Sequence, residues 1–130
     1  MKLRELDPEW VRWEDRYLTA EEEKAEGVFS NRTDRRHTYI PVVQTLHEAQ
    51  GIEFDCPKCR DPNRAHRIQV AFHGRGVLEH HGSRNKDGKP TRWHVVGGSS
   101  FDDLSLSPSI DCTPSDPNCW HGHITAGEAK

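Results

Sequence analysis

Aromatic residues near the start of the chain recur at helical spacing. Asp7 and Pro8 are typical of a helix start, because the aspartate side chain can cap the first turn and the proline ring fits the first helical position. Trp10, Trp13 and Tyr17 follow three to four residues apart, as on one face of a helix. We therefore predict an N-terminal helix that packs its aromatic face on the body of the protein, with a partner-binding face as the alternative.

The polar segments that follow carry helix and turn signals. Thr19 and Glu22 form the pattern of a capping box, and Gly27 suits the end of a short helix. Residues 28–37 are polar and turn-prone, which predicts a loop, whereas the β-branched and aromatic side chains of residues 38–43 favour extended backbone. The region therefore mixes helical and extended structure.

The rest of the chain changes to period-two alternation. A second capping box at Thr45-Leu46-His47-Glu48 predicts one helical turn, and residues 73–91, rich in glycine and charge, predict a long exposed connection. Alternating apolar and polar positions indicate half-buried strands. These strand candidates are residues 52–54, 68–72, 93–96, 104–106 and 119–125.

The elements predict a mainly β protein of the α+β class, a small antiparallel sheet or sandwich preceded by an N-terminal helical segment. We expect residues 1–44 to be a helical and extended segment packed on or appended to the body, and residues 45–130 to form the β domain. The composition also indicates that the fold needs stabilisation beyond its hydrophobic core. Because only 32% of the residues are hydrophobic and 30% are charged, the core is lean, and a metal ion would add stability.

Cysteine spacing indicates where such an ion binds. Cys56 and Cys59 enclose two residues, the spacing of a zinc knuckle. The chain has neither the apolar run of about 20 residues that crosses a bilayer nor a signal-peptide pattern at its start, so we expect a cytoplasmic protein without membrane contact. Cysteines are reduced in the cytoplasm, which favours a metal site over the alternative of a disulfide or redox pair.

A second group of ligand-type side chains lies near the C-terminus. If the backbone is extended from Cys119 onward, Cys119, His121 and His123 share one face, and His121 is the nearer histidine. We predict a structural zinc site, a closed tetrahedron that leaves no position for water. Its predicted ligands are Cys56, Cys59, Cys119 and His121.

Three residues compete for the fourth position. Cys112 in place of His121 would give an all-cysteine site, although Cys112 is equally well explained as a half-buried thiol. His66 and His123 are lesser candidates. The fourth position therefore has several candidate ligands, unlike the three positions assigned to cysteines.

An enzymatic alternative uses the same cluster with one position open. His121 and His123 in place of one thiolate, with a bound water, would suit a metal-dependent hydrolase or nuclease. Zinc-protease and deaminase motifs are absent, and Asn85 follows His80 and His81 too closely for a usual HNH-type nuclease finger. The sequence therefore favours a protein that is not an enzyme. In the enzymatic alternative, a neighbouring carboxylate such as Asp102, Asp103 or Glu128 would act as the base.

Charge is unevenly distributed, although the net charge is only −3. Between Cys56 and His94, nine basic residues stand against three acidic ones. This excess can attract phosphate, but a solvated loop face beside the thiolates is the simpler interpretation.

Several short motifs occur in order between residues 45 and 129. They are Thr45-Leu46-His47-Glu48-Ala49-Gln50-Gly51, Phe54 with Cys56-Pro57-Lys58-Cys59, His66 with Ile68 and Val70, Arg92-Trp93, Asp103-Leu104, Pro108-Ser109-Ile110 and Cys119-Trp120-His121-Gly122. In these motifs the chain resembles a family of small uncharacterised proteins encoded by phages and prophages. The resemblance implies one signature formed by Cys56, Cys59, Cys119 and His121, with His66 and Trp93 near it. The chain departs from the family pattern at His123, where an aromatic residue is usual, and at the additional Cys112.

The resulting expectation is a non-enzymatic, zinc-binding phage or prophage accessory protein in the host cytoplasm. It would act by binding a macromolecular partner, either a protein or a nucleic acid. The contact surface would be the basic region of residues 56–94 or the stripe of Trp10, Trp13 and Tyr17.

Overall fold

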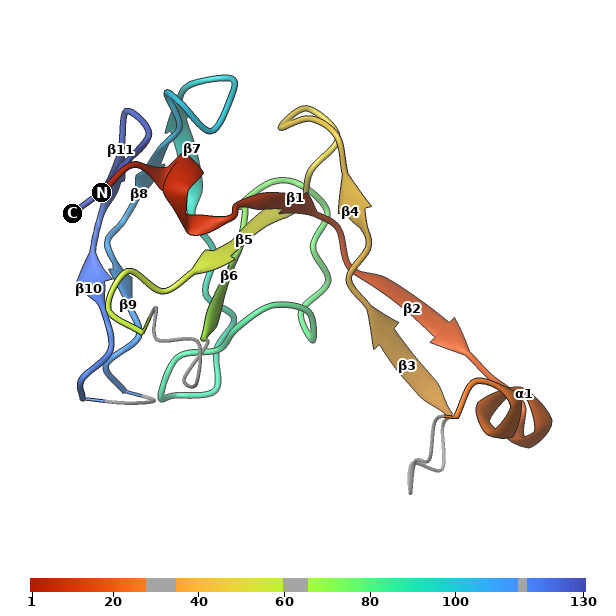
Figure 1. The fold of residues 1–130 in the computed structure, drawn as a ribbon. Helices are drawn as coiled ribbons and strands as arrows, with labels where there is room; N and C mark the ends of the chain where they lie inside the picture. The colour runs from red at the N-terminus through yellow and green to blue at the C-terminus, as the bar shows by residue number, and fades with distance from the viewer. Residues whose placement is uncertain (28–34, 60–65, 115–116) are drawn as a thin grey trace.

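The computed structural model describes residues 1–27, 35–59, 66–114 and 117–130, which form mostly β structure (Figure 1). The prediction of a mainly β protein with small antiparallel sheets is confirmed, and the described residues contain one short α-helix. In chain order the elements are η1 (Leu3–Leu6), β1 (Glu9–Val11), β2 (Glu14–Tyr17), α1 (Ala20–Ala25), β3 (Arg36–Tyr39), β4 (Val42–Val43), β5 (Gly51–Asp55), β6 (Arg67–Ala71), β7 (His94–Gly97), β8 (Ser105–Ser107), β9 (Ile110–Asp111), β10 (His121–Gly122), β11 (Ile124–Thr125) and β12 (Glu128–Ala129).

The central sheet has four antiparallel strands in the order β4-β1-β5-β6. Its longest ladder joins β5 to β6, with Phe54 opposite Ile68 and Ile52 opposite Val70. These four side chains are buried, as the alternating pattern of both segments predicts. The ladder matters for the site, because both of its strands lead directly into ligand-type residues.

The predicted N-terminal helix is wrong. Asp7 has a left-handed backbone conformation with φ 50°, and the chain then enters β1, which is hydrogen-bonded to β4 on one side and to β5 on the other. The two ladders stabilise an extended backbone over a helix in this segment, because they provide hydrogen-bond partners for β1 on both of its edges.

The aromatic residues of this segment still pack on the body. Trp10 is 5% exposed and stacks on Phe101 with ring centroids 4.3 Å apart, and Trp13 is 7% exposed. Only Tyr17, which is 68% exposed, faces solvent. The three residues therefore do not form a continuous surface stripe.

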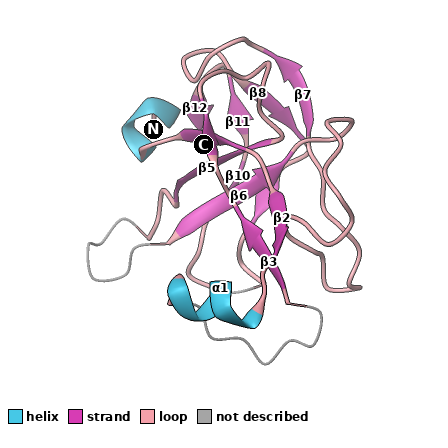
Figure 2. Cartoon of the chain, turned by 90° about the vertical axis from the view of Figure 1, so that its right-hand side faces the viewer, coloured by secondary structure: helices cyan, strands magenta, loops and turns pink. Residues whose placement is uncertain are grey.

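The first capping box is present as predicted. The Thr19 hydroxyl accepts the backbone N–H of Glu22 at 3.2 Å and caps α1, after which Gly27 adopts a positive φ of 71°. Of the loop predicted over residues 28–37, residues 28–34 lie outside the described ranges, and β3 begins at Arg36. Strands β2 and β3 pair and extend, with α1, away from the four-stranded sheet (Figures 1 and 2).

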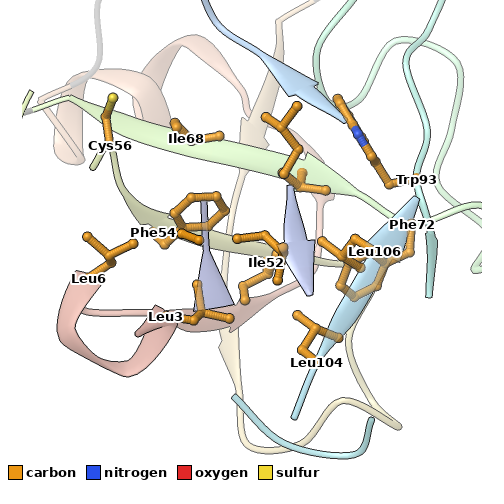
Figure 3. Close-up of a cluster of buried hydrophobic side chains, with 14 of the residues drawn as sticks. Leu3, Leu6, Ile52, Phe54, Cys56, Ile68, Phe72, Trp93, Leu104 and Leu106 are labelled. Atoms are coloured by element: carbon orange, nitrogen blue, oxygen red, sulfur yellow. The ribbon is translucent and has the colours of Figure 1, made fainter. Parts of the chain in front are cut away.

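The core gathers side chains from distant parts of the chain (Figure 3). Leu3 and Leu6 of the first turn pack with Phe54 of β5 and with Leu104 near β8, and all four are fully buried. Cys56 lies at the margin of the same cluster (Figure 3). The N-terminal residues thus contribute to the core that supports the candidate site.

Within the described ranges, no helix is both long enough and apolar enough to cross a membrane.

The C-terminal strand is divided. Residues predicted as one strand from 119 to 125 form β10 and β11, which pair with β9 and β12 respectively. Cys119 lies in a bend before β10, not in a strand. The connection over residues 73–91 is irregular, as predicted, but His81 within it is only 3% exposed.

Candidate metal centre

Three cysteines and one histidine converge at one end of the β5–β6 ladder. The Sγ atom of Cys119 lies 3.4 Å from Sγ of Cys56, 3.9 Å from Sγ of Cys59 and 3.3 Å from Nδ1 of His66. The four ligand atoms all lie within 4.8 Å of one another. The cluster therefore brings together ligands from three separate segments of the chain.

Local backbone structure places each of these residues. Cys56 directly follows β5, and a tight turn returns the N–H of Cys59 to the carbonyl of Cys56 at 3.2 Å. His66 directly precedes β6 and accepts the N–H of Cys56 on its carbonyl oxygen at 2.8 Å. Cys119 enters from the bend before β10. Strand ends and turns thus supply all four positions.

The spacing of the ligand atoms fits a zinc ion. Zinc–sulfur bonds of about 2.3 Å and a zinc–nitrogen bond of about 2.0 Å in a tetrahedron place sulfur atoms about 3.8 Å apart and sulfur and nitrogen about 3.5 Å apart. The observed separations of 3.3 to 3.9 Å bracket these values. None of the four cysteines of the chain is in a disulfide. Three thiols and one imidazole are a donor set typical of structural zinc.

The environment prepares Cys56 for metal binding. Burial raises the pKa of its thiol, but backbone N–H groups of Lys58, Trp120 and Cys59 point at the sulfur and help to lower that pKa to about 7. Burial raises the pKa of Cys119, and the adjacent Cys56 sulfur raises it further. A metal ion would hold both sulfurs as thiolates, since a bound cation replaces their protons.

The structure places His66 with the three cysteines, and His121 elsewhere. His121 is exposed, and its Nε2 atom lies 3.3 Å from Oγ of Ser109. The prediction of His121 assumed an extended backbone from Cys119 onward, in which the two side chains share a face. Because the strand begins only at His121, Cys119 turns inward and His121 outward. His123 is also exposed and pairs through its backbone with Lys130.

Cys112 lies beside the cluster without belonging to its four ligands. Its N–H donates to the carbonyl of Trp120 at 3.0 Å, and its half-buried side chain packs against the core. Burial raises the pKa of this thiol to about 11. Cys112 is therefore a half-buried thiol next to the Cys119 sulfur that is not one of the four clustered ligands.

Trp120 and Gly122 shape the wall behind Cys119. The Trp120 ring is 5% exposed and packs edge-on against Phe54, with centroids 6.2 Å apart. A Cβ atom on Gly122 would lie 2.6 Å from the Trp120 ring and would also meet the carbonyl oxygen of Lys130. Packing thus explains Trp120 and Gly122 in this motif, because only glycine leaves room for the indole.

A cavity of about 600 Å³ adjoins the cluster, and its lining includes His66 and Cys112. Cationic side chains line it as well, namely Arg67, Arg84, Lys86 and Arg92, whereas Asp111 is the acidic residue of the lining. Arg67 is neutralised, because it forms ion pairs with four carboxylates. Arg84, Lys86 and Arg92 form no ion pair with the described residues, so part of the excess of positive charge found in the sequence lies at this cavity.

The fold and this cluster define the chain as a mostly β protein with a candidate Cys3His metal centre. No protein-family model, curated protein or solved structure matches it.

Proposed function

We propose that this chain is a non-enzymatic protein with a structural zinc ion, and that it binds an anionic macromolecular partner at the basic cavity. The observation that carries the proposal is a concave site with three unneutralised cationic side chains directly beside the metal cluster. The resemblance to phage and prophage proteins supports an accessory role in a host cytoplasm.

The metal contributes structure in this proposal. The lean core is joined across 63 residues by the contact between Cys56 and Cys119, and one ion would fix both together with Cys59 and His66. Closing so long a loop restricts the unfolded chain, and the zinc-binding free energy becomes folding free energy. Four protein ligands complete a tetrahedron, which leaves no position for a substrate.

The charged groups of the cavity are arranged for an external anion. Arg84 donates to the carbonyls of Gly88 and Glu79, and Arg92 donates to those of Leu78 and His81, so both guanidinium groups are held by neutral acceptors. Burial lowers the pKa of Arg92, and the charge of Arg84 lowers it further. Two cations held side by side favour an anion that approaches both.

The enzymatic alternative has less support at this cluster. It requires His121 and His123 as ligands and a nearby carboxylate as base, yet both histidines are exposed outside the cluster. The carboxylates have other partners. Asp102 pairs with Arg4, Asp103 accepts the N–H groups of Ser99 and Ser100, and Glu128 faces the N-terminal amino group.

Binding of single-stranded DNA and RNA oligonucleotides, measured by fluorescence anisotropy over a range of salt concentrations, tests the proposal. We expect affinity to fall as salt rises, because phosphate contacts release counterions. The double variant Arg84→Gln/Lys86→Gln should bind more weakly and lower the salt slope by about one for each cation that contacts phosphate. Arg16→Gln is the matched control, since Arg16 lies on β2 and stacks on Tyr39. Binding that ignores salt, or no binding at low salt, would contradict a nucleic-acid partner and favour a protein.

A further inference from the structure

A second group of ligand-type side chains lies outside the cysteine cluster. The two oxygens of the Asp15 carboxylate each meet a different imidazole: Oδ2 lies 2.6 Å from Nε2 of His80, and Oδ1 lies 2.7 Å from Nε2 of His81. All three ligand atoms lie within 4.8 Å of one another. The carboxylate comes from β2, and the imidazoles come from the irregular connection between β6 and β7.

The geometry is unusual for adjacent residues. In extended backbone, neighbouring side chains point to opposite faces. Here a turn closes with the N–H of His81 donating to the carbonyl of Leu78 at 3.0 Å, and both rings turn to one side, with centroids 4.2 Å apart. The turn therefore presents two imidazole nitrogens to a single carboxylate.

The surrounding structure holds these groups in place. Asp15 lies on a strand, and its Oδ1 atom also accepts the hydroxyl of Thr38 from β3 at 3.1 Å. The side chain of His81 is 2% exposed, and its carbonyl accepts a bond from Arg92 at 2.8 Å. His80 is 32% exposed, which leaves one side of the group open to solvent. A fixed set of donors with one open side is the arrangement of a metal site that retains solvent.

We propose that Asp15, His80 and His81 form a second metal site, which binds a divalent transition-metal ion through two imidazole nitrogens and one carboxylate oxygen. Nitrogen and oxygen ligands of this kind suit zinc, cobalt and nickel. Three protein ligands leave at least one coordination position for water. None of the three proposed ligands belongs to the cysteine cluster or lines the basic cavity, so the inference does not depend on the proposed function.

Metal binding here requires a shift of the proton within each imidazole ring and no net release of protons. A neutral imidazole carries one N–H, and in the metal-free site that N–H on Nε2 donates to Asp15. The ion takes the Nε2 lone pair, and the ring proton moves to Nδ1 by exchange with water. Neither ring changes charge, and the ion takes the place of two hydrogen bonds. Around a tetrahedral ion, the bound carboxylate oxygen and each imidazole nitrogen must lie about 3.4 Å apart, given ligand bonds of about 2.0 to 2.2 Å.

Titration of the untagged, metal-free chain with Co²⁺ under reducing conditions distinguishes the two sites. The cysteine cluster should give an intense sulfur-to-cobalt charge-transfer band. The second site should give only weak visible bands, because nitrogen and oxygen ligands lack that transition. We expect two equivalents of Co²⁺, the second without the charge-transfer band. A titration that ends at one equivalent showing the charge-transfer band would overturn the inference, whereas one equivalent without that band would contradict only the cysteine site.

The variant His80→Gln separates metal binding from hydrogen bonding. Glutamine removes the imidazole but retains an N–H donor toward Asp15. The turn should therefore stay hydrogen-bonded to β2, and the melting temperature of the protein should not change. We expect the affinity of the second equivalent to fall at least about tenfold, as losses near metal ligands typically do, with the sulfur band unchanged. His47→Gln, at an exposed histidine in another turn, is the matched control. If His80→Gln binds the second equivalent as tightly as this control, the three residues are a hydrogen-bonded anchor only.

Discussion

Cys56 and His66 are cross-strand neighbours. The β5–β6 register pairs Phe54 with Ile68 and Asp55 with Arg67, and the next step of the ladder is the bond from the N–H of Cys56 to the carbonyl of His66 at 2.8 Å. Directly paired residues of an antiparallel ladder share a face. His66 is therefore presented to the metal cluster by the same alternation that buries Phe54.

This relationship predicts the fourth ligand. His66→Gln should reduce the zinc content of the purified protein well below one equivalent and lower its melting temperature, because the site keeps only three ligands. His121→Gln should leave both values unchanged, since His121 faces Ser109. Metal analysis with thermal denaturation checks both variants. Zinc loss in His121→Gln with full retention in His66→Gln would restore His121 as the ligand.

Loss of a cysteine ligand should be more severe. Cys56→Ser is expected to release the metal and to lower the free energy of unfolding by at least about 2 kcal/mol, which is roughly 5 to 10 °C in melting temperature for a chain of this size. Cys112→Ser is the matched control and should keep its metal, because Cys112 lies beside the four ligands. Full metal content and an unchanged melting curve in Cys56→Ser would rule out this cysteine as a ligand.

Packing behind Cys119 gives a third prediction. Gly122→Ala should destabilise the protein by about 1 to 3 kcal/mol, because its methyl group overlaps the Trp120 ring and a backbone carbonyl. Gly97→Ala is the control, since a methyl group there would lie 3.7 Å from its nearest neighbour, the Cβ of Ser105. Chemical denaturation measures both. Equal stability of the two variants would contradict this prediction and show that the Trp120 side chain can move to make room for the methyl group without loss of stability.

The hydrogen bonds of Glu23 predict a pH dependence. His37 lowers the pKa of this carboxyl most, burial opposes the shift, and Arg35 lowers the pKa further, so the folded value lies below the ordinary 4.5. The stabilisation from Glu23 is therefore fully present above pH 4.5 and is lost as the pH falls through the folded pKa.

Glu23→Gln tests this dependence. Wild type should be the more stable protein at neutral pH, and the difference between the two should shrink as the pH falls below 4.5. Glu21→Gln, at an exposed position of the same helix, should show no such trend. A stability difference between wild type and Glu23→Gln that stays constant with pH would contradict the prediction.

Local patterns were sufficient where a single segment determines its own structure. The capping box at Thr19 and the alternation of Ile52 with Phe54 depend on neighbouring residues, and both predictions are confirmed. The spacing of Trp10 and Trp13 led to the wrong prediction of a helix, because the same spacing also fits one residue in a short strand and one in the connection that follows it. The two ladders that flank β1 decide between them, and both come from distant residues.

The site was predictable to a similar extent. Cys56 and Cys59 follow from their spacing, and Cys119 stands out as a second ligand type far along the chain. His66 could have been found by pairing the two predicted strands: with Phe54 opposite Ile68, each step outward keeps the sum of the two residue numbers at 122, which places His66 opposite Cys56. The bend at Cys119 has no comparable signal, so the direction of His121 could not be predicted from alternation.

His66 faces the metal cluster and also forms part of the wall of the basic cavity. If ion and partner both depend on the position of this ring, their affinities are thermodynamically linked, and each must strengthen or weaken the other by the same factor. If the partner binds the ring in the position that zinc fixes, removal of zinc would also weaken binding of the partner.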